Sequence, residues 1–230
     1  MRKLSIIAVI VLLLAGIAAA VWTLTHRREN ATVADRLAQY GPAARARLRP
    51  LFPVYPPTQL TIVGLKHEKR LQLYAATGKD ESKFIREYPI LAASGTIGPK
   101  LREGDRQVPE GLYRIESLNP NSRFHLSLRI NYPNQADRNV AEREGRTKLG
   151  GDIMIHGNRV SVGCLAVGDQ AAEDLFVLAA DTGLQNIEVI LSPVDFRVRS
   201  LPRDIPPPPG WMTYRYRLIA GALDRLPSPK

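Results

Sequence analysis

The 230-residue sequence contains a single cysteine, Cys164, and only four histidines. One cysteine cannot form a disulfide within the chain, so in an oxidising compartment its thiol would have to be buried or kept for chemistry. The scattered histidines also lack the paired ligand spacing of a structural zinc site, and we predict neither a metal nor a cofactor. No internal repeat or low-complexity segment competes with a folded domain.

The middle of the chain carries almost no net charge. Of the net charge of +10, residues 50–196 carry −1, whereas residues 26–49 carry +4 and residues 197–230 carry +5. The middle has no basic stripe interleaved with aromatic residues and no nucleic-acid motif, so nucleic-acid binding is a poor alternative. Basic flanks would instead attract anionic lipid or an acidic polymer.

The stretch from Gly151 to Asp169 concentrates the features of a reactive site. The short apolar run Ile153–Ile155 is bounded by turn formers, which predicts a buried strand with His156 at its end. Cys164 follows a glycine, eight residues after that histidine. A lone thiol near an imidazole suggests a nucleophile and its base, because the imidazole draws the thiol toward the attacking thiolate.

Simpler interpretations exist for both residues. A single cysteine is often a small buried hydrophobe, and a histidine beside a strand is often only hydrogen-bonded. Gly157 and Gly163 favour the catalytic interpretation, because glycines let backbone N–H groups turn toward a developing oxyanion. Asp169 is predicted to cap a helix that ends at Gly183 and buries an apolar face of Ala172, Leu175, Phe176 and Ala179.

The run from Ile155-His156-Gly157 through Ser161-Val162-Gly163-Cys164 resembles the signature of the L,D-transpeptidase catalytic domain, the YkuD-type family of cysteine enzymes of bacterial cell walls. The resemblance extends upstream to the turn and strand of Gly104–Ile115 and covers roughly residues 60–191. Three features depart from the family pattern: the loop from His156 to Cys164 is short, Val162 replaces a common histidine, and Ala166 replaces a common Arg or Asn. These departures point to a short-loop, YafK-like subgroup.

The resemblance implies a mostly β fold, a YkuD-like β-sandwich of two packed, curved sheets with one principal helix after the catalytic cysteine. It also implies a thioester mechanism, in which Cys164 is the nucleophile, His156 the base and the Gly157 carbonyl the group that orients the base. Backbone N–H groups near Gly163 and Cys164 would hold the oxyanion. Possible substrate-binding residues are Ser161, Arg129, Tyr132 and Arg159.

The implied activity is murein L,D-transpeptidation, which is acyl transfer on peptidoglycan stem peptides in cell-wall remodelling and cell shape. Two alternatives stay open. One is a hydrolase of the same family, of the peptidoglycan amidase or L,D-carboxypeptidase type. The other is a catalytically silent, membrane-tethered module that only binds the wall.

The N-terminus predicts a membrane segment within residues 1–25, because the run from Leu4 to Thr25 has no charge. As a helix it would be about 33 Å long, enough to cross a hydrocarbon core. We expect a single-pass anchor in the inner membrane with the catalytic domain in the periplasm. A cleaved signal that yields a periplasmic protein is the alternative, because Ala18-Ala19-Ala20 satisfies a small-x-small site.

The remaining chain divides into three further parts. Residues 26–57 are predicted to be a basic spacer bounded by prolines. A short amphipathic helix in this spacer would be interrupted at Gly41-Pro42. Residues 58–196 form the catalytic domain, with strands expected at 60–65, 71–75, 84–93, 112–117, 124–130 and 187–191 and a long polar loop at 131–150. Alternation puts His125 and Arg129 on one face, either bordering the cleft or simply solvated. Residues 197–230 form a Pro-rich basic tail that either folds back or lies at a membrane surface.

Overall fold

The structure is a computed structural model that describes residues 13–17, 31–78 and 81–229. Its described part is mostly β-sheet, with a few helices around it. The strands are β1 (Gln59–Leu65), β2 (Arg70–Ala76), β3 (Lys83–Pro89), β4 (Ala92–Ala93), β5 (Gly111–Ser122), β6 (His125–Ile130), β7 (Met154–His156), β8 (Leu165–Ala166) and β9 (Ile187–Ser192). The described helices of nine or more residues are α2 (Val33–Leu48), α3 (Gln135–Arg143), α4 (Asp169–Thr182) and α5 (Met212–Leu223).

The strands join in one hydrogen-bonded order, β3-β2-β1-β9-β5-β6-β7-β8-β4. The long strand β5 links two halves, because Gly111–Arg114 pair with β9 and the stretch from Ile115 to Ser122 pairs with β6. The two packed sheets that the resemblance implied are therefore continuous with each other through β5. A sequence pattern of strands does not reveal that a single strand serves both halves.

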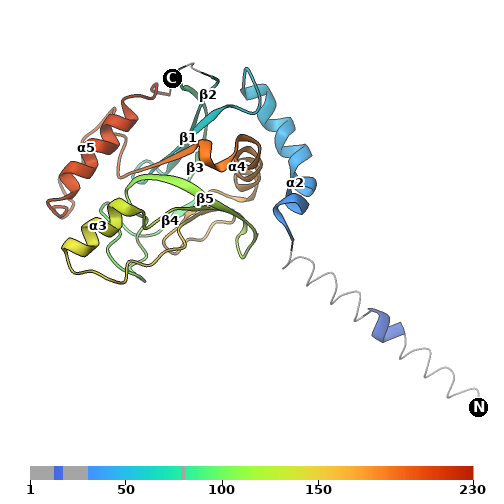
Figure 1. The fold of residues 1–230 in the computed structure, drawn as a ribbon, viewed down its shortest axis with the longest axis horizontal. Helices are drawn as coiled ribbons and strands as arrows, with labels where there is room; N and C mark the ends of the chain where they lie inside the picture. Colours follow the sequence, from blue (N-terminus) through green and yellow to red (C-terminus); the bar gives the residue numbers. More distant parts are fainter. Residues whose placement is uncertain (1–12, 18–30, 79–80, 230) are drawn as a thin grey trace, which may run out of the picture.

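Helices cover both faces of the half that contains β1, β2 and β9, as Figure 1 shows with α2 and α4 on one side and α5 on the other. On β1, Leu60 and Ile62 join the cluster that includes α4, whereas Val63 and Leu65 join the cluster built on α5. All four side chains are almost fully buried. Because both faces are covered, β1 is continuously apolar from Ile62 to Leu65.

The expectation of one principal helix is too low, because the described part of the chain has four helices of nine or more residues. The predicted loop at 131–150 contains α3, because Asn134 forms a capping box with Asp137. The tail folds back as α5, and its Ile219 and Leu223 are fully buried. The helix after the cysteine begins after Gly168, and the side chain of Asp169 does not cap it. That side chain instead accepts a hydrogen bond from the backbone N–H of Asn158.

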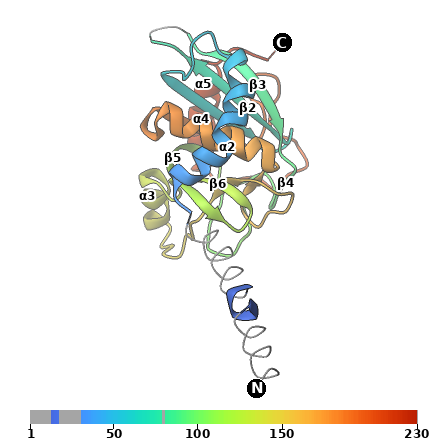
Figure 2. The same cartoon turned by 90° about the vertical axis from the view of Figure 1, so that its right-hand side faces the viewer.

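The segment expected to be a spacer packs against α4 as helix α2, which crosses in front of α4 in Figure 2. The expectation that Gly41-Pro42 would interrupt this helix is wrong, because Pro42 lies inside α2. Proline removes one helical hydrogen bond, and packing offsets that loss here. Ala44 and Leu48 are fully buried.

Ion pairs tie α2 to α4 as well. The Arg45 guanidinium donates two hydrogen bonds to the Asp181 carboxylate at 2.8 and 2.7 Å. The Tyr55 hydroxyl donates to the same carboxylate at 2.8 Å. These donors lower the pKa of Asp181, although burial opposes that shift most strongly. The structure therefore joins residues 33–55 to the folded unit.

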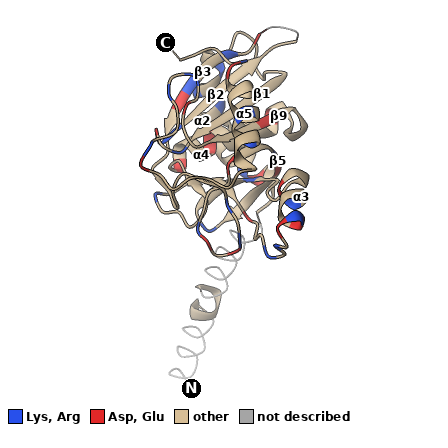
Figure 3. Cartoon of the chain, turned by 90° about the vertical axis from the view of Figure 1, so that its left-hand side faces the viewer, with Lys and Arg blue, Asp and Glu red and all other residues tan. Residues whose placement is uncertain are grey.

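The predicted membrane segment, residues 4–25, lies for the most part outside the described residues. Only its residues 13–17 are described, and they are helical. Within residues 13–17, 31–78 and 81–229, no helix combines the length and apolar character needed to cross a membrane. Basic and acidic residues nearly cancel over residues 50–196, and Figure 3 shows the two signs interleaved along the folded part of the chain.

If α2 is an integral part of the domain, Asp181→Ala should destabilise it. The change leaves the partly buried Arg45 and the Tyr55 hydroxyl without their acceptor, and we expect a loss of about 1–3 kcal/mol of unfolding free energy. Chemical denaturation would measure it. Asp204→Ala is the control, because Asp204 is exposed. Equal stability of the two variants would show that α2 is only loosely attached.

Candidate active site

The pairing of β7 with β8 places the histidine and the cysteine together. The two strands run parallel, with Ile155 opposite Leu165 and His156 opposite Ala166. Extended by one residue, the register puts Cys164 opposite Met154. Side chains alternate along a strand, so Cys164 and His156 share a face, one strand and two residues apart. At about 4.8 Å between strands and about 3.3 Å per residue, their Cα atoms are about 8 Å apart.

The opposite face of the two strands is apolar and covered by α4. Ile155 and Leu165 are fully buried there, in the cluster that includes Leu175 and Phe176 of the helix. The predicted apolar face of this helix is confirmed, because Ala172, Leu175, Phe176 and Ala179 are all fully buried. The helix therefore holds the strands from behind and leaves the other face to the reactive pair.

His156 is held in one tautomer. Its Nδ1 lies 2.6 Å from the carbonyl oxygen of Gly157. A carbonyl can only accept, so Nδ1 carries the proton and Nε2 keeps its lone pair. The ring stacks on Phe124, with centroids 4.8 Å apart and 28° between the planes. Nε2 is buried and has no hydrogen-bond partner among the described residues, which leaves it available as a base.

Burial sets the protonation of both residues. It lowers the pKa of His156, and the bond to the Gly157 carbonyl opposes this shift. Burial also raises the pKa of the Cys164 thiol, while a backbone hydrogen bond at Met154 acts the other way. The thiol itself lies 3.5 Å from the carbonyl oxygen of Asp152. Both shifts favour a neutral thiol beside a neutral imidazole.

Two serine hydroxyls hold the backbone of the cysteine loop. The N–H of Gly163, which has a positive φ of 90°, donates to Ser94 Oγ. The N–H of Cys164 donates to Ser161 Oγ at 3.0 Å, and that hydroxyl lies 2.5 Å from the Cys164 carbonyl oxygen. Both N–H groups predicted to hold the oxyanion thus already have partners. A substrate oxygen at either one would replace a hydroxyl.

The four predicted substrate-binding residues lie in different environments. Arg129 pairs in register with Met154, so it shares the face of the reactive pair, and it forms an ion pair with Asp152 at 3.1 Å. The Ser161 hydroxyl is engaged with the backbone of Cys164, as described above. Tyr132 is buried and stacks edge-on with Tyr113. The structure brings Arg129 and Ser161 near the reactive pair.

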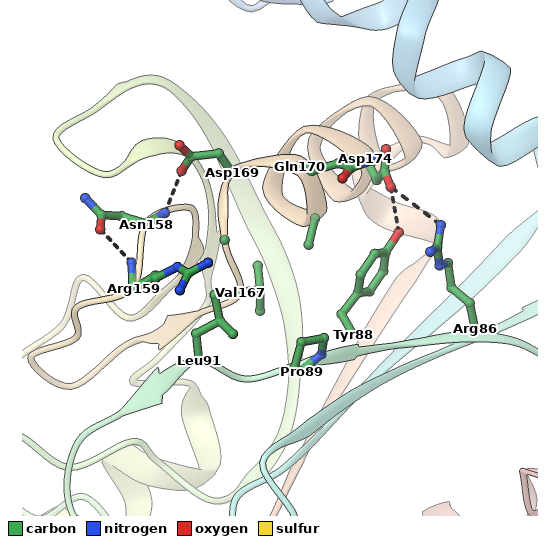
Figure 4. Close-up of a pocket in the computed structure, with 12 residues that line it drawn as sticks. Arg86, Tyr88, Pro89, Leu91, Asn158, Arg159, Val167, Asp169, Gln170 and Asp174 are labelled. Atoms are coloured by element: carbon green, nitrogen blue, oxygen red, sulfur yellow. Dashed lines mark hydrogen bonds and ion pairs between the residues drawn. The ribbon is translucent and has the colours of Figure 1, made fainter.

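Arg159 lies in the turn after β7 and lines a cavity of about 570 Å³ at the beginning of α4. Figure 4 shows it beside Leu91 and Val167, with Asp174 held by Tyr88 and Arg86 across the cavity. Val167 lies one residue beyond β8, on the face opposite to Cys164 by strand alternation. The cavity therefore belongs to the α4 side of the sheet.

Sequence reasoning missed Ser94 and Phe124. Ser94 contacts Gly163 from 69 residues away, and no local pattern marks such a contact. The alternating pattern of residues 124–130 predicts a strand for Phe124 and no contact with His156. No group of three or more His, Cys, Asp or Glu side chains in the described part of the chain could hold a metal ion.

Comparisons with known proteins identify the family. Residues 54–190 match the model of the YkuD L,D-transpeptidase catalytic domain family. Over 113 residues the chain is 37% identical to the putative L,D-transpeptidase YafK of Escherichia coli K12, and equally to that of strain O157:H7. The matched region covers 48% of this chain and 43% of those relatives, so the chain spans less than half of their length.

Among solved structures, a point mutant of the helical cell shape determining protein Pgp2 from Campylobacter jejuni aligns with a TM-score of 0.50 and 19% identity. The alignment covers 72% of this chain and 53% of Pgp2, and it shows a likeness of fold alone. The family match covers more than half of the chain, including Cys164 and His156. The sequence resemblance is therefore confirmed, and the chain belongs to the YkuD family of L,D-transpeptidase catalytic domains.

Proposed function

We propose that the protein is a cysteine-dependent acyltransferase that acts on peptidoglycan stem peptides, a murein L,D-transpeptidase. The observation that supports this most directly is the buried Nε2 of His156, which has no partner among the described residues and lies on the same face as Cys164. The family supplies the reaction class, and its similar relatives are named putative L,D-transpeptidases. Pgp2, which shares the fold, is a protein that determines helical cell shape.

The mechanism begins from a neutral pair. As the Cys164 sulfur attacks an amide carbonyl of the stem peptide, His156 Nε2 accepts the thiol proton. The tetrahedral intermediate collapses when the C–N bond breaks and the imidazolium returns the proton to the leaving amine. A thioester on Cys164 remains. In the second half, an amine attacks the thioester, loses its proton to His156 and regenerates the thiol.

The loop between the two residues supplies the oxyanion donor in this proposal. The acyl oxygen takes the place of the Ser161 hydroxyl on the N–H of Cys164, while Ser94 keeps its bond to the N–H of Gly163. The N–H of Cys164 is bonded to the Ser161 hydroxyl before substrate binds. When substrate covers it, this N–H therefore has no hydrogen bond to water to lose. Arg129 is well placed to bind a substrate carboxylate, because it shares the reactive face.

The second candidate is a hydrolase of the same family, and the turn after His156 supports it. The turn residue Val160 is 54% exposed and Val162, next to the Gly-Cys pair, is 70% exposed. Such a short, open loop leaves water near the thioester, and water competes with the acceptor amine. Ala166 is fully buried in the pairing of β8 with β4, so it offers a substrate no side-chain hydrogen bond.

We also propose that the domain works in the periplasm on an N-terminal inner-membrane anchor. The support is the uncharged run from Leu4 to Thr25 in the sequence and a family activity directed at the cell wall. A cleaved signal would leave the domain in the same compartment. The basic charge of residues 26–49 fits either arrangement, since it follows the apolar run directly.

Substitution of the nucleophile tests the reaction class. Cys164→Ala should retain the fold and lose turnover of disaccharide tetrapeptides by about 10³-fold or more, and His156→Ala by about 10²–10⁴-fold. His67→Ala is the matched control, because His67 is exposed on the turn between β1 and β2. Wild-type turnover in Cys164→Ala, measured by chromatography of the products, would exclude the thioester mechanism.

The pH dependence of thiol alkylation tests the neutral pair. Burial raises the pKa of Cys164 and lowers that of His156, so the iodoacetamide rate should still be rising above about pH 8.5, where a free cysteine is half ionised. Glutathione alkylated under the same conditions is the reference. A plateau already reached between about pH 5 and pH 7 would instead show a preformed thiolate–imidazolium pair and contradict this mechanism.

Partition of the thioester distinguishes transfer from hydrolysis. With a tetrapeptide donor and a free D-amino acid as acceptor, the transpeptidase should form the exchanged tetrapeptide faster than the hydrolysed tripeptide. The hydrolase candidate predicts that the tripeptide forms at least as fast, because the loop leaves the thioester open to water. Mass spectrometry separates the two products. Exchange well above hydrolysis would reject the hydrolase candidate and leave the transpeptidase.

A further inference from the structure

The side chain of Glu110, the residue just before β5, is a fully buried carboxylate at 0% exposure. Its Oε1 accepts hydrogen bonds from Lys66 Nζ and from the backbone N–H of Gly98, both at 2.8 Å. Its Oε2 accepts from the hydroxyl of Tyr216 at 2.7 Å. Every one of these bonds matters, because a buried carboxylate that loses a donor keeps the cost of its desolvation.

Tyr216 comes from outside the region that matches the family. It lies in α5, which covers residues 212–223, whereas the family match ends at residue 190. Arg215 of the same helix donates to the backbone carbonyl of Glu110 at 3.3 Å and pairs with Asp137 of α3. The C-terminal helix thus supplies two donors to one residue of the family domain, on the face of the sheet opposite to α4 (Figure 1).

From Glu110 a path of hydrogen bonds leads to the cysteine loop, with the covalent backbone between Arg106 and Gln107 as one of its links. Gly98 belongs to the segment between β4 and β5, which Gln107 braces by accepting from the Thr96 N–H at 2.8 Å and donating to the Gly98 carbonyl at 2.9 Å. Ser94 in the same segment donates to the carbonyl of Arg106 at 2.8 Å. The Ser94 hydroxyl then accepts the N–H of Gly163, next to the nucleophile.

We propose that Tyr216 is a positioning residue, which acts through Glu110 and Ser94 to fix the orientation of the Gly163–Cys164 peptide. The inference rests on the proposed acyl-transfer function. The Cys164 N–H that would face the oxyanion belongs to this peptide, so its direction depends on how firmly Ser94 holds the adjacent N–H. The C-terminal helix thereby contributes to transition-state binding without touching substrate.

Two reagents separate this role from a purely structural one. Acylation of Cys164 by p-nitrophenyl acetate forms a tetrahedral oxyanion before p-nitrophenolate leaves, so it depends on the backbone donor. Alkylation by iodoacetamide displaces iodide from carbon and forms no oxyanion, so it reports only the availability of thiolate. The ratio of the two second-order rates therefore measures the backbone geometry in a single sample of the full-length protein.

Tyr216→Phe should lower this ratio about ten-fold, as a partial loss of an oxyanion donor would, while alkylation itself changes little. Tyr214→Phe on the same helix is the matched control, because Tyr214 is 62% exposed. Ser94→Ala should lower the ratio similarly. The double variant should be no worse than the more affected single one, because both changes interrupt one chain of bonds.

An unchanged ratio in Tyr216→Phe, with only a lower melting temperature, would overturn the inference, and so would additive effects in the double variant. If Tyr216→Phe does not fold, Arg215→Lys carries the same expectation and the same test. If Cys164 of the unaltered protein is alkylated but never acylated, the proposed function fails and this inference with it. Normal acylation with an unchanged ratio contradicts the inference alone.

Discussion

The parallel pairing of β7 with β8 is the constraint on which the rest of the site depends. It puts His156 and Cys164 on one face at neighbouring positions, and it turns Ile155 and Leu165 toward α4. A shift of register by one residue would send the cysteine into the core and break the site. Strands of only three and two residues, as β7 and β8 are, would not be stable alone. The long strand β5 and the helices α2 and α4 give them a rigid support.

Burial then decides the chemistry that this geometry can support. A desolvated imidazole with a lowered pKa is a poor partner for a preformed ion pair but a suitable acceptor for a proton that leaves during attack. The Gly157 carbonyl fixes the tautomer, and Phe124 fixes the plane of the ring. This arrangement fits the proton transfer that the proposed acyl transfer requires in its transition state.

The parts of the site that sequence could predict are those with short-range signals. A strand ending in histidine, a glycine before a lone cysteine and the apolar face of the next helix all lie within residues 151–183, and the structure has them. The contacts that brace the loop join residues far apart, as Ser94 with Gly163 and Tyr216 with Glu110 do. Such pairs have no periodicity. The sequence predicts a loop where Asn134 begins α3, because the polar residues of a capping box also favour turns.

The claim at the centre of this account is that Cys164 carries the acyl group, and a rapid-quench mass measurement tests it most directly. The full-length protein would be mixed with disaccharide tetrapeptide, quenched in acid and analysed intact and after proteolysis. The account predicts an adduct with the mass of the disaccharide tripeptide acyl group on the peptide containing Cys164, removable by hydroxylamine. Product formation that continues without such an adduct, and after alkylation of Cys164, would contradict it.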